Sequence, residues 1–279
     1  MKTVVVGFDG SDSSLVAMDW AAERAAHDPT RIEIVAIGGS IVSDDSRVDD
    51  SLRSAERRVL DSAPDCDVTS RRVGGSMPRA LFEQATAADL LVVGAHRDGA
   101  ASSLLSVRFL HHLARSVVPI VVVPAHWAPS DASVVVGFSG YEASPGVVAV
   151  AAAQAHAVGT SLAMVHAWQM PVPRIEGPIS LRASPIQVRA EQSKALRSAA
   201  LRPRTAYPDL RVEQVLSHGD TAEVLLEHAR HASLLIIGAP RRGIIADALL
   251  GSVAHELLTR SSIPVCIVPN TAPVDVAAR

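Results

Sequence analysis

Aromatic residues, cysteines and lysines are all scarce in this sequence. Phe, Trp and Tyr together make up 3% of the 279 residues, so the core must be built from aliphatic side chains. The two cysteines, Cys66 and Cys266, are too few for a disulfide framework, and nothing in their spacing indicates a zinc site. Cys266 lies in an apolar run, and we expect it to be a small buried hydrophobic residue. The two lysines, Lys2 and Lys194, indicate a coding bias rather than a function.

The sequence also lacks a strong charge imbalance and a long apolar run. It has 26 basic and 29 acidic residues and a net charge of -3, which argues against a surface devoted to nucleic acid or anionic lipid. No apolar stretch approaches the roughly 20 residues of a membrane-spanning helix, and the first residues lead directly into a strand without a basic leader. We therefore expect a reduced, cytoplasmic, soluble protein with neither a nucleic-acid partner nor a membrane partner.

An internal repeat of the size of a domain is present instead. VVVGFDGSDSS at 4–14 returns as VVVGFSGYEAS at 134–144. GSMPRALFEQATAADLLVVGA at 75–95 returns as GDTAEVLLEHARHASLLIIGA at 219–239, and LLSVRFLHHLARSVVPIVVVP at 104–124 returns as LLGSVAHELLTRSSIPVCIVP at 249–269. The segment between the copies, AHWAPSDAS, has the composition of a linker. The repeat predicts two domains, over 1–125 and 133–270.

Each copy alternates apolar runs with helical patterns. In the first copy we predict strands over 3–8, 32–37, 68–73, 90–93 and 120–123, and helices over 13–26, 48–63, 78–88 and 104–115. Continuous apolar strands separated by helices are typical of a parallel sheet covered on both faces. The sequence therefore predicts an α/β protein with two repeated doubly wound domains, each a five-stranded parallel sheet with four helices on its two faces.

The last strands of the two sheets, over 118–123 and 263–268, are strongly apolar. Apolar strands at a sheet edge are normally covered or paired. We expect these two strands to pair within the chain as a pseudo-dimer, and further association into a homodimer remains open.

The segments that follow strands one and four are the candidate ligand site. In an open parallel sheet, ligands bind beyond the carboxyl ends of the strands, where the strand order reverses. Strand one is followed by Asp9 in the first copy and Ser139 in the second, and strand four by GAHRDG and GAPRRG. Glycine lets backbone N–H groups approach phosphate, and arginine adds charge. Taken singly, each feature also has a structural explanation: a tight turn for a glycine, a helix N-cap for Asp9.

Taken together, these segments resemble the universal stress protein family. The resemblance rests on VVVGFDGSDSS, on VVGA and IIGA followed by a glycine-containing turn, on LLGSVAHELL and on IPVCIVP, and it covers 3–124 and 133–269. It implies an adenine nucleotide alpha hydrolase-like fold and a regulatory role in the stress response rather than catalysis. It also implies ATP as the ligand of one half or of neither, with Mg²⁺ accompanying it, and places His166 in the lining of the pocket.

ATP-binding members of this family have an Asp at the end of strand one and a G-x2-G-x9-G-(S/T) signature after strand four. The resemblance implies that the Asp contacts adenine or ribose and that the glycines surround the phosphates. The second half reads Gly238-x2-Arg241-x9-Gly251-Ser252, and its strand-one position is Ser139. It therefore retains the phosphate contacts and lacks the nucleoside contact.

The first half shows the reverse pattern. It retains Asp9, but its signature reads Gly94-x2-Arg97-x8-Ser106-Val107, which is one residue short and lacks the final Gly-Ser. Arg97 and Arg241 either supply phosphate charge or fill the space of the lost glycine, which would weaken binding. The second half is the better ATP candidate. The candidate nucleotide-binding residues are Gly7, Asp9, Gly94 and Arg97 in the first half and Gly137, Gly238, Ala239, Arg241, Gly243, Gly251, Ser252 and Val253 in the second.

Other classes of site find less support. There is no G-x4-G-K-(S/T) motif and no G-x-S-x-G elbow, and the histidines show no metal-ligand spacing. SGYEAS at 139–144 is similar to the S-G-G-x-D-S loop of ATP pyrophosphatases, but Tyr141 and Ala143 replace its glycine and aspartate. Three hypotheses follow: an ATP-dependent stress regulator, a nucleotide-independent interaction module of the same fold, and a disfavoured pyrophosphatase-type enzyme.

Overall fold

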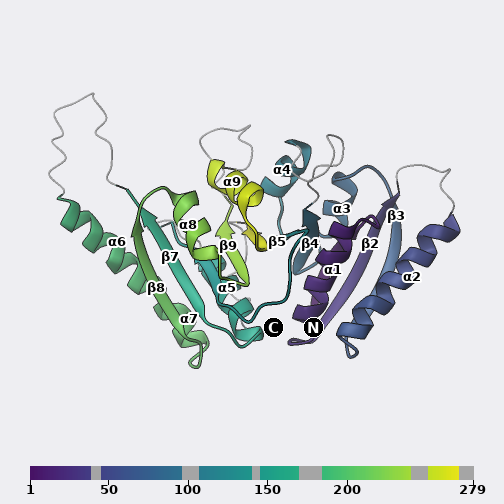
Figure 1. Ribbon diagram of the computed structural model, residues 1–279, viewed down its shortest axis with the longest axis horizontal. Coiled ribbons are helices and arrows are strands. Elements are labelled where there is room, and N and C mark those ends of the chain that lie inside the picture. The colour runs from purple at the N-terminus through teal and green to yellow at the C-terminus, as the bar shows by residue number, and fades with distance from the viewer. Residues whose placement is uncertain (39–44, 96–106, 140–144, 170–183, 240–250, 270–279) are drawn as a thin grey trace.

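The computed structural model describes residues 1–38, 45–95, 107–139, 145–169, 184–239 and 251–269, which form one continuous sheet with helices on both faces (Figure 1). The strands are β1 (Lys2–Phe8), β2 (Thr30–Gly38), β3 (Asp67–Gly74), β4 (Leu90–Ala95), β5 (Ile120–Pro124), β6 (Val134–Gly137), β7 (Leu162–Trp168), β8 (Val212–His218), β9 (Leu234–Gly238) and β10 (Val265–Val268). The helices are α1 (Asp12–Ala25), α2 (Asp45–Ser62), α3 (Arg79–Gln84), α4 (Val107–Ala114), α5 (Pro145–Ala157), α6 (Pro185–Ala199), α7 (Leu201–Ala206), α8 (Thr221–Ala229) and α9 (Ser252–Arg260).

The strand order confirms the predicted fold and the predicted pairing of the two halves. The ten strands lie in the order β3-β2-β1-β4-β5-β10-β9-β6-β7-β8. All neighbours within a half are parallel, whereas β5 and β10 are antiparallel, with Val121 opposite Cys266. The last strand of each half is thus at the centre of the molecule, where both of its edges are hydrogen-bonded.

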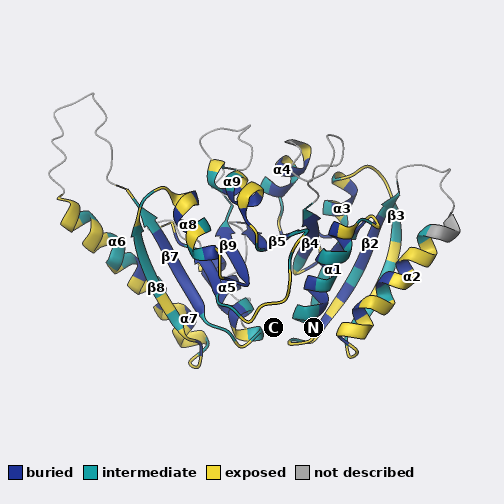
Figure 2. Cartoon of the chain, viewed as in Figure 1, coloured by how far each residue is buried: buried dark blue, intermediate teal, exposed yellow. Residues whose placement is uncertain are grey.

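The core consists of two apolar layers, one on each face of the sheet. Alternate strand residues point into the two layers, so that Val6 packs under α1 and α2 while Val5 packs under α3 and α4. In the second half α5 and α6 cover the first face, α8 and α9 cover the second, and α7 packs against α5. The strands at the middle of the sheet are almost entirely buried, as Figure 2 shows.

The outer edges of the sheet are β3 and β8, and their composition suits that position. Their sequences, DVTSRRVG and VEQVLSH, mix apolar with polar and charged residues, and they hold exposed positions such as Thr69 and Arg71. Charged and polar side chains on an edge strand disfavour pairing with another chain. Among the described helices, none is long and apolar enough to cross a bilayer.

Two helices differ from the sequence prediction. The helix expected over 78–88 ends at Gln84, because the Thr86 hydroxyl donates to the Glu83 carbonyl (2.8 Å) and the chain turns toward β4. The described second half contains five helices rather than four, since α6 and α7 are separate. Pro203, in the first turn of α7, has no N–H to donate to the carbonyl of Ala199, and the helix is interrupted at Ala200.

Candidate functional site

Asp9 follows β1 and is exposed at the carboxyl end of the sheet in the first half. Its Oδ1 accepts hydrogen bonds from the backbone N–H of Ser11 (2.9 Å) and from the Ser11 hydroxyl (2.5 Å). Ser11 is the N-cap of α1, where its hydroxyl oxygen accepts from the N–H of Ser14 (3.2 Å). Asp9 is therefore not the cap itself but the residue that orients the cap.

The two first-half glycines at this edge are closely packed. A Cβ at Gly94 would lie 2.0 Å from the carbonyl oxygen of Ser13, so only glycine lets β4 end against the first turn of α1. A Cβ at Gly7 would lie 2.8 Å from Leu81 Cδ2 of α3. Packing against helices explains both glycines, and neither contact requires a ligand.

The matching glycines of the second half have slightly more room. A Cβ at Gly238 would lie 3.1 Å from Val147 Cγ2 of α5, and one at Gly137 would lie 3.0 Å from Leu225 Cδ1 of α8. These neighbours are side-chain methyl groups, which can shift, rather than backbone. Ala239 donates its N–H to the carbonyl of Val268 (2.8 Å), so that N–H is committed to the sheet and is not a phosphate donor.

The start of α9 is the part of the candidate site that is best suited to an anion. Gly251 is the N-cap, with φ -52° and ψ 153°, and among the residues that the structure describes no side chain caps the helix. Ser252 and Val253 occupy the first turn, and the Ser252 side chain is exposed. The N–H groups of a first turn have no partner within the helix, and the helix dipole gives them a partial positive charge. This end of α9 can therefore donate hydrogen bonds to phosphate oxygens.

The other end of α9 is fixed to α8 by charge. Arg260 donates to both carboxylate oxygens of Glu223, at 2.6 and 3.2 Å, and also pairs with Glu256. The Arg260 guanidinium holds the pKa of the Glu223 carboxyl below its usual value. These exposed pairs orient α9 more than they stabilise the fold.

His166, which the family resemblance places in the lining of the pocket, lies beside the carboxyl end of β6. Its Nδ1 is 2.6 Å from the carbonyl oxygen of Phe138, and its Nε2 is 2.8 Å from the side-chain amide of Gln192 on α6. His166 is 6% exposed, and its ring packs edge-on against Phe138. His166 thus joins β6, β7 and α6, and supports the edge of the site through the backbone of Phe138.

A hollow of about 260 Å³ adjoins this edge, between α5 and the α6–α7 pair, with Phe138, Pro145 and Arg202 in its wall. It is smaller than typical small-molecule pockets of about 300–1,000 Å³. Arg97, Arg241 and Gly243 lie outside the described residues. The structure therefore brings together Gly137, Gly238 and Ala239 at the ends of β6 and β9, and places Gly251–Val253 at the start of the following helix.

The roles of Ser11, which caps α1 in place of Asp9, and of Gln192, which bonds His166, were not predicted from the sequence. The Asp-x-Ser spacing of Asp9 and Ser11, directly before a helical pattern, is a recognisable capping signal. Gln192 carries no such signal, because its relation to His166 depends on the packing of α6 against β7.

Comparisons with known proteins agree with this architecture. The model of the universal stress protein family matches the chain twice, over 1–124 and 132–269. A universal stress protein of Mycobacterium tuberculosis is 30% identical over 293 residues, which cover 95% of this chain and 96% of that relative. One from Mycolicibacterium smegmatis is 27% identical over 296 residues, covering 95% and 96%. The crystal structure of a universal stress protein from Archaeoglobus fulgidus superposes with a TM-score of 0.71 at 13% identity, covering 96% of this chain and 98% of that one.

Proposed function

Because the chain belongs to the universal stress protein family, in two tandem copies, we propose that it is a regulatory protein of the stress response that binds an adenine nucleotide in its second half. The single observation that carries this proposal is the start of α9. Gly251 caps the helix without a side chain, and it occupies the position of the last signature glycine. In the nucleotide-binding members of the family, that glycine and the hydroxyl residue after it surround the phosphates.

The proposed ligand is ATP, with its phosphates at Gly251, Ser252 and Val253. Backbone N–H groups at a helix start bind anions without a buried counter-charge. A Mg²⁺ ion accompanying the triphosphate would find an oxygen ligand in the exposed Ser252 hydroxyl. The nucleoside end is weaker, because Ser139 replaces the aspartate that Asp9 supplies in the first half. We expect weak binding, with no turnover of the nucleotide.

The structural roles of the motif residues in the first half favour a second candidate function, that of an interaction module. There Asp9 is engaged by Ser11, and Gly94 is required by its contact with Ser13. The features that resemble a nucleotide site thus have structural roles. A nucleotide-independent interaction module of the same fold would retain these residues for folding alone. In either case we propose a cytoplasmic protein.

The test is calorimetric titration of ATP into the purified chain, with acid extraction to detect nucleotide that co-purifies. The proposal predicts one equivalent of ATP per chain, lost in Gly251→Val and retained in Asp9→Ala. Binding lost in Asp9→Ala but retained in Gly251→Val would place the nucleotide in the first half. No binding at millimolar ATP would favour the interaction module. Release of pyrophosphate would support the enzyme class that we disfavour.

A further inference from the structure

A cavity of about 360 Å³ lies in the seam between the two halves, beside the helices α1 and α5. Its walls come from the amino ends of β1 and β4, from residues 117–119 before β5, and from the carboxyl-terminal halves of α1 and α5. The helix α9 packs on the other face of the sheet, so this cavity is separate from the candidate nucleotide site. Its volume is within the range of small-molecule sites, which is about 300–1,000 Å³.

The cavity exists because the side chains that α1 and α5 bring to the seam are small. Ala21 and Ala25 line it from α1, and Ala153 and Ala157 line it from α5. Residues four apart lie on one face of a helix, so each helix turns an alanine-bearing face toward the same space. The space between the halves is therefore wider here than longer aliphatic side chains would leave it.

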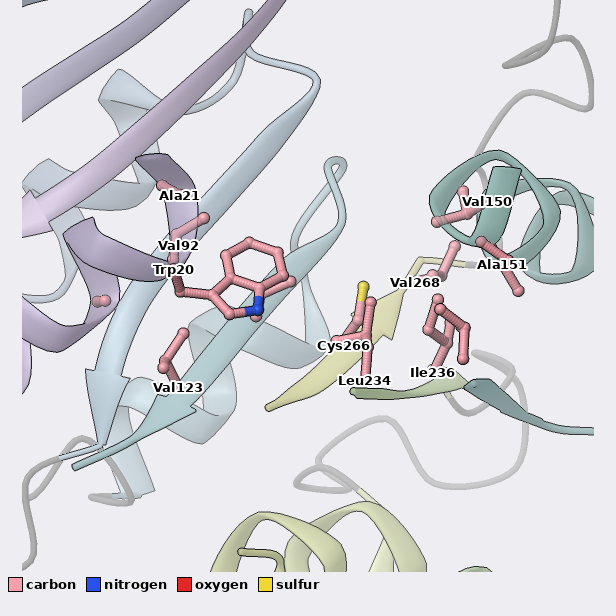
Figure 3. Packing of buried hydrophobic residues seen from close by; sticks show 14 of the residues in the cluster. Trp20, Ala21, Val92, Val123, Val150, Ala151, Leu234, Ile236, Cys266 and Val268 are labelled. Atoms are coloured by element: carbon pink, nitrogen blue, oxygen red, sulfur yellow. The ribbon is translucent and has the colours of Figure 1, made fainter. Parts of the chain in front are cut away.

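Trp20 also belongs to the wall, but its ring is packed into the seam rather than into the cavity. It is 1% exposed, and its indole extends from α1 toward Cys266 and Leu234 of the second half (Figure 3). Val4 and Leu90, at the amino ends of their strands, add aliphatic surface to the lining. Water in a cavity needs two to four polar partners, and apolar cavities accept apolar molecules instead.

The charged residues of the wall are already engaged. Lys2 Nζ lies 2.6 Å from Asp28 Oδ2, and Arg24 Nε lies 3.2 Å from Glu23 Oε2. Asp89 Oδ2 accepts a backbone N–H of β1 (2.8 Å). Among the described residues, the wall thus holds two charges of each sign, every one with a contact of its own. An ionic ligand would have to break one of these contacts or bring an unpaired charge into apolar surroundings, and both are costly.

The rim of the cavity gives access from solvent. Val117 lines it and is 55% exposed. The side chains of the Lys2–Asp28 pair are 29% and 33% exposed, so this pair also lies toward the surface. A molecule that enters past this rim would place its apolar part against the alanines and keep a polar end near water.

We propose that this cavity binds an uncharged small molecule with an apolar body, which contacts both halves of the chain. The aliphatic walls match such a body, the engaged charges disfavour an anion or a cation, and the volume excludes a macromolecule. Because α1 belongs to the first repeat and α5 to the second, a bound molecule would stabilise the seam between them. The proposal does not depend on the nucleotide site.

The test uses 1-octanol as the probe and the full chain with ¹³C-labelled methyl groups. We expect octanol to bind one per chain by calorimetry and to shift the assigned methyl signals of Val4, Leu90 and Val150 saturably. Octanoate and octylammonium have the same apolar body with a negative or a positive charge. We expect each of them to bind about ten-fold more weakly than octanol.

Three variants distinguish binding in the cavity from binding elsewhere. Ala25→Phe fills the cavity from α1 and Ala157→Phe fills it from α5, and each should weaken octanol binding by about ten-fold or more. Both positions are half-buried, so we expect these two filled variants to fold, which circular dichroism checks. Ala26→Phe is the matched control, because Ala26 is exposed and does not line the cavity, and it should bind octanol as the wild type does.

Three results would overturn the proposal. The first is the absence of a saturable shift of the cavity methyl signals up to the solubility limit of octanol. The second is binding of octanoate or octylammonium as tight as that of octanol. The third is octanol binding that survives in either filled variant, since the molecule would then lie outside the cavity.

Discussion

A side chain at Gly94 would place its Cβ 2.0 Å from the backbone carbonyl oxygen of Ser13. The end of β4 and the first turn of α1 are thus in direct backbone contact at the carboxyl edge of the first-half sheet. At Gly238, the matching position of the second half, the nearest atom to a Cβ would be a methyl group of Val147, at 3.1 Å. The two repeats share a motif, but the motif glycine has a stricter packing role in the first.

Gly94→Ala should destabilise the protein by about 3 kcal/mol, because backbone rather than a side chain must move to accept the methyl group. Gly238→Ala is the matched control and should cost about 1 kcal/mol or less, since Val147 can shift. Urea unfolding of both variants measures the difference. Equal costs would show that the contact of Gly94 with Ser13 relaxes freely.

The β5–β10 seam should tolerate charge far less than the outer edge. Val121 is 1% exposed and lies opposite Cys266. Val121→Glu would therefore bury a carboxylate without a partner among apolar side chains at the centre of the sheet. We expect a loss of about 3 kcal/mol or more. Thr69→Glu, at an exposed position of β3, should change stability by about 0.5 kcal/mol or less. Thermal or urea unfolding compares the stability of the two variants. A loss of stability in Val121→Glu as small as that in Thr69→Glu would contradict the burial of the β5–β10 pair at the centre of the sheet.

Cys266 should make stability depend on pH in the alkaline range. It is fully buried, and desolvation raises the pKa of its thiol to about 12. In the unfolded chain the thiol ionises as the pH rises above about 9, whereas in the folded chain it stays protonated. The contribution of this thiol to the free energy of unfolding is therefore present below about pH 9 and is lost as the pH rises toward about 12. The stability of the wild-type chain relative to Cys266→Ala should fall by about 1.4 kcal/mol between about pH 8 and about pH 10. Urea unfolding at the two pH values measures it. A constant difference would show that the folded thiol ionises normally.

Ser139→Asp should strengthen nucleotide binding in the second half. The substitution restores the strand-one carboxylate that Asp9 provides in the first half, in the half where we propose that Gly251 binds the phosphates. We expect ATP affinity to rise about ten-fold, equivalent to about 1.4 kcal/mol. Ser133→Asp, a serine just before β6, is the control. If both variants bind ATP as the wild type does, the carboxylate at this position does not determine affinity.

The sequence predicts the elements of this fold well because the signals are local. Val-rich runs such as those ending at Phe8 and Val123 become buried parallel strands, and the apolar last strands become the central pair. The break before Leu201 and the early end of α3 depend on single contacts, the missing N–H of Pro203 and the Thr86 hydroxyl. Local propensity does not determine such ends.

The candidate site was harder to predict from the sequence, because glycine can serve either close packing or ligand binding. Gly94 and Gly251 both belong to the glycine signature, yet the contact with Ser13 explains the first, whereas the second is the N-cap of α9. Only the packing distinguishes them. The burial of the Trp20 indole N–H also has no sequence signal, since it depends on how α1 packs against the second half.

The most direct test of the proposed nucleotide site is a titration of ATP into the ¹⁵N-labelled chain, following assigned backbone amide signals. If the phosphates bind at the start of α9, the amides of Ser252 and Val253 should shift saturably, while that of Ser11 in the first half stays in place. The shifts should disappear in Gly251→Val. Saturable shifts at Ser11 alone, or no shift in either half at millimolar ATP, would contradict the account.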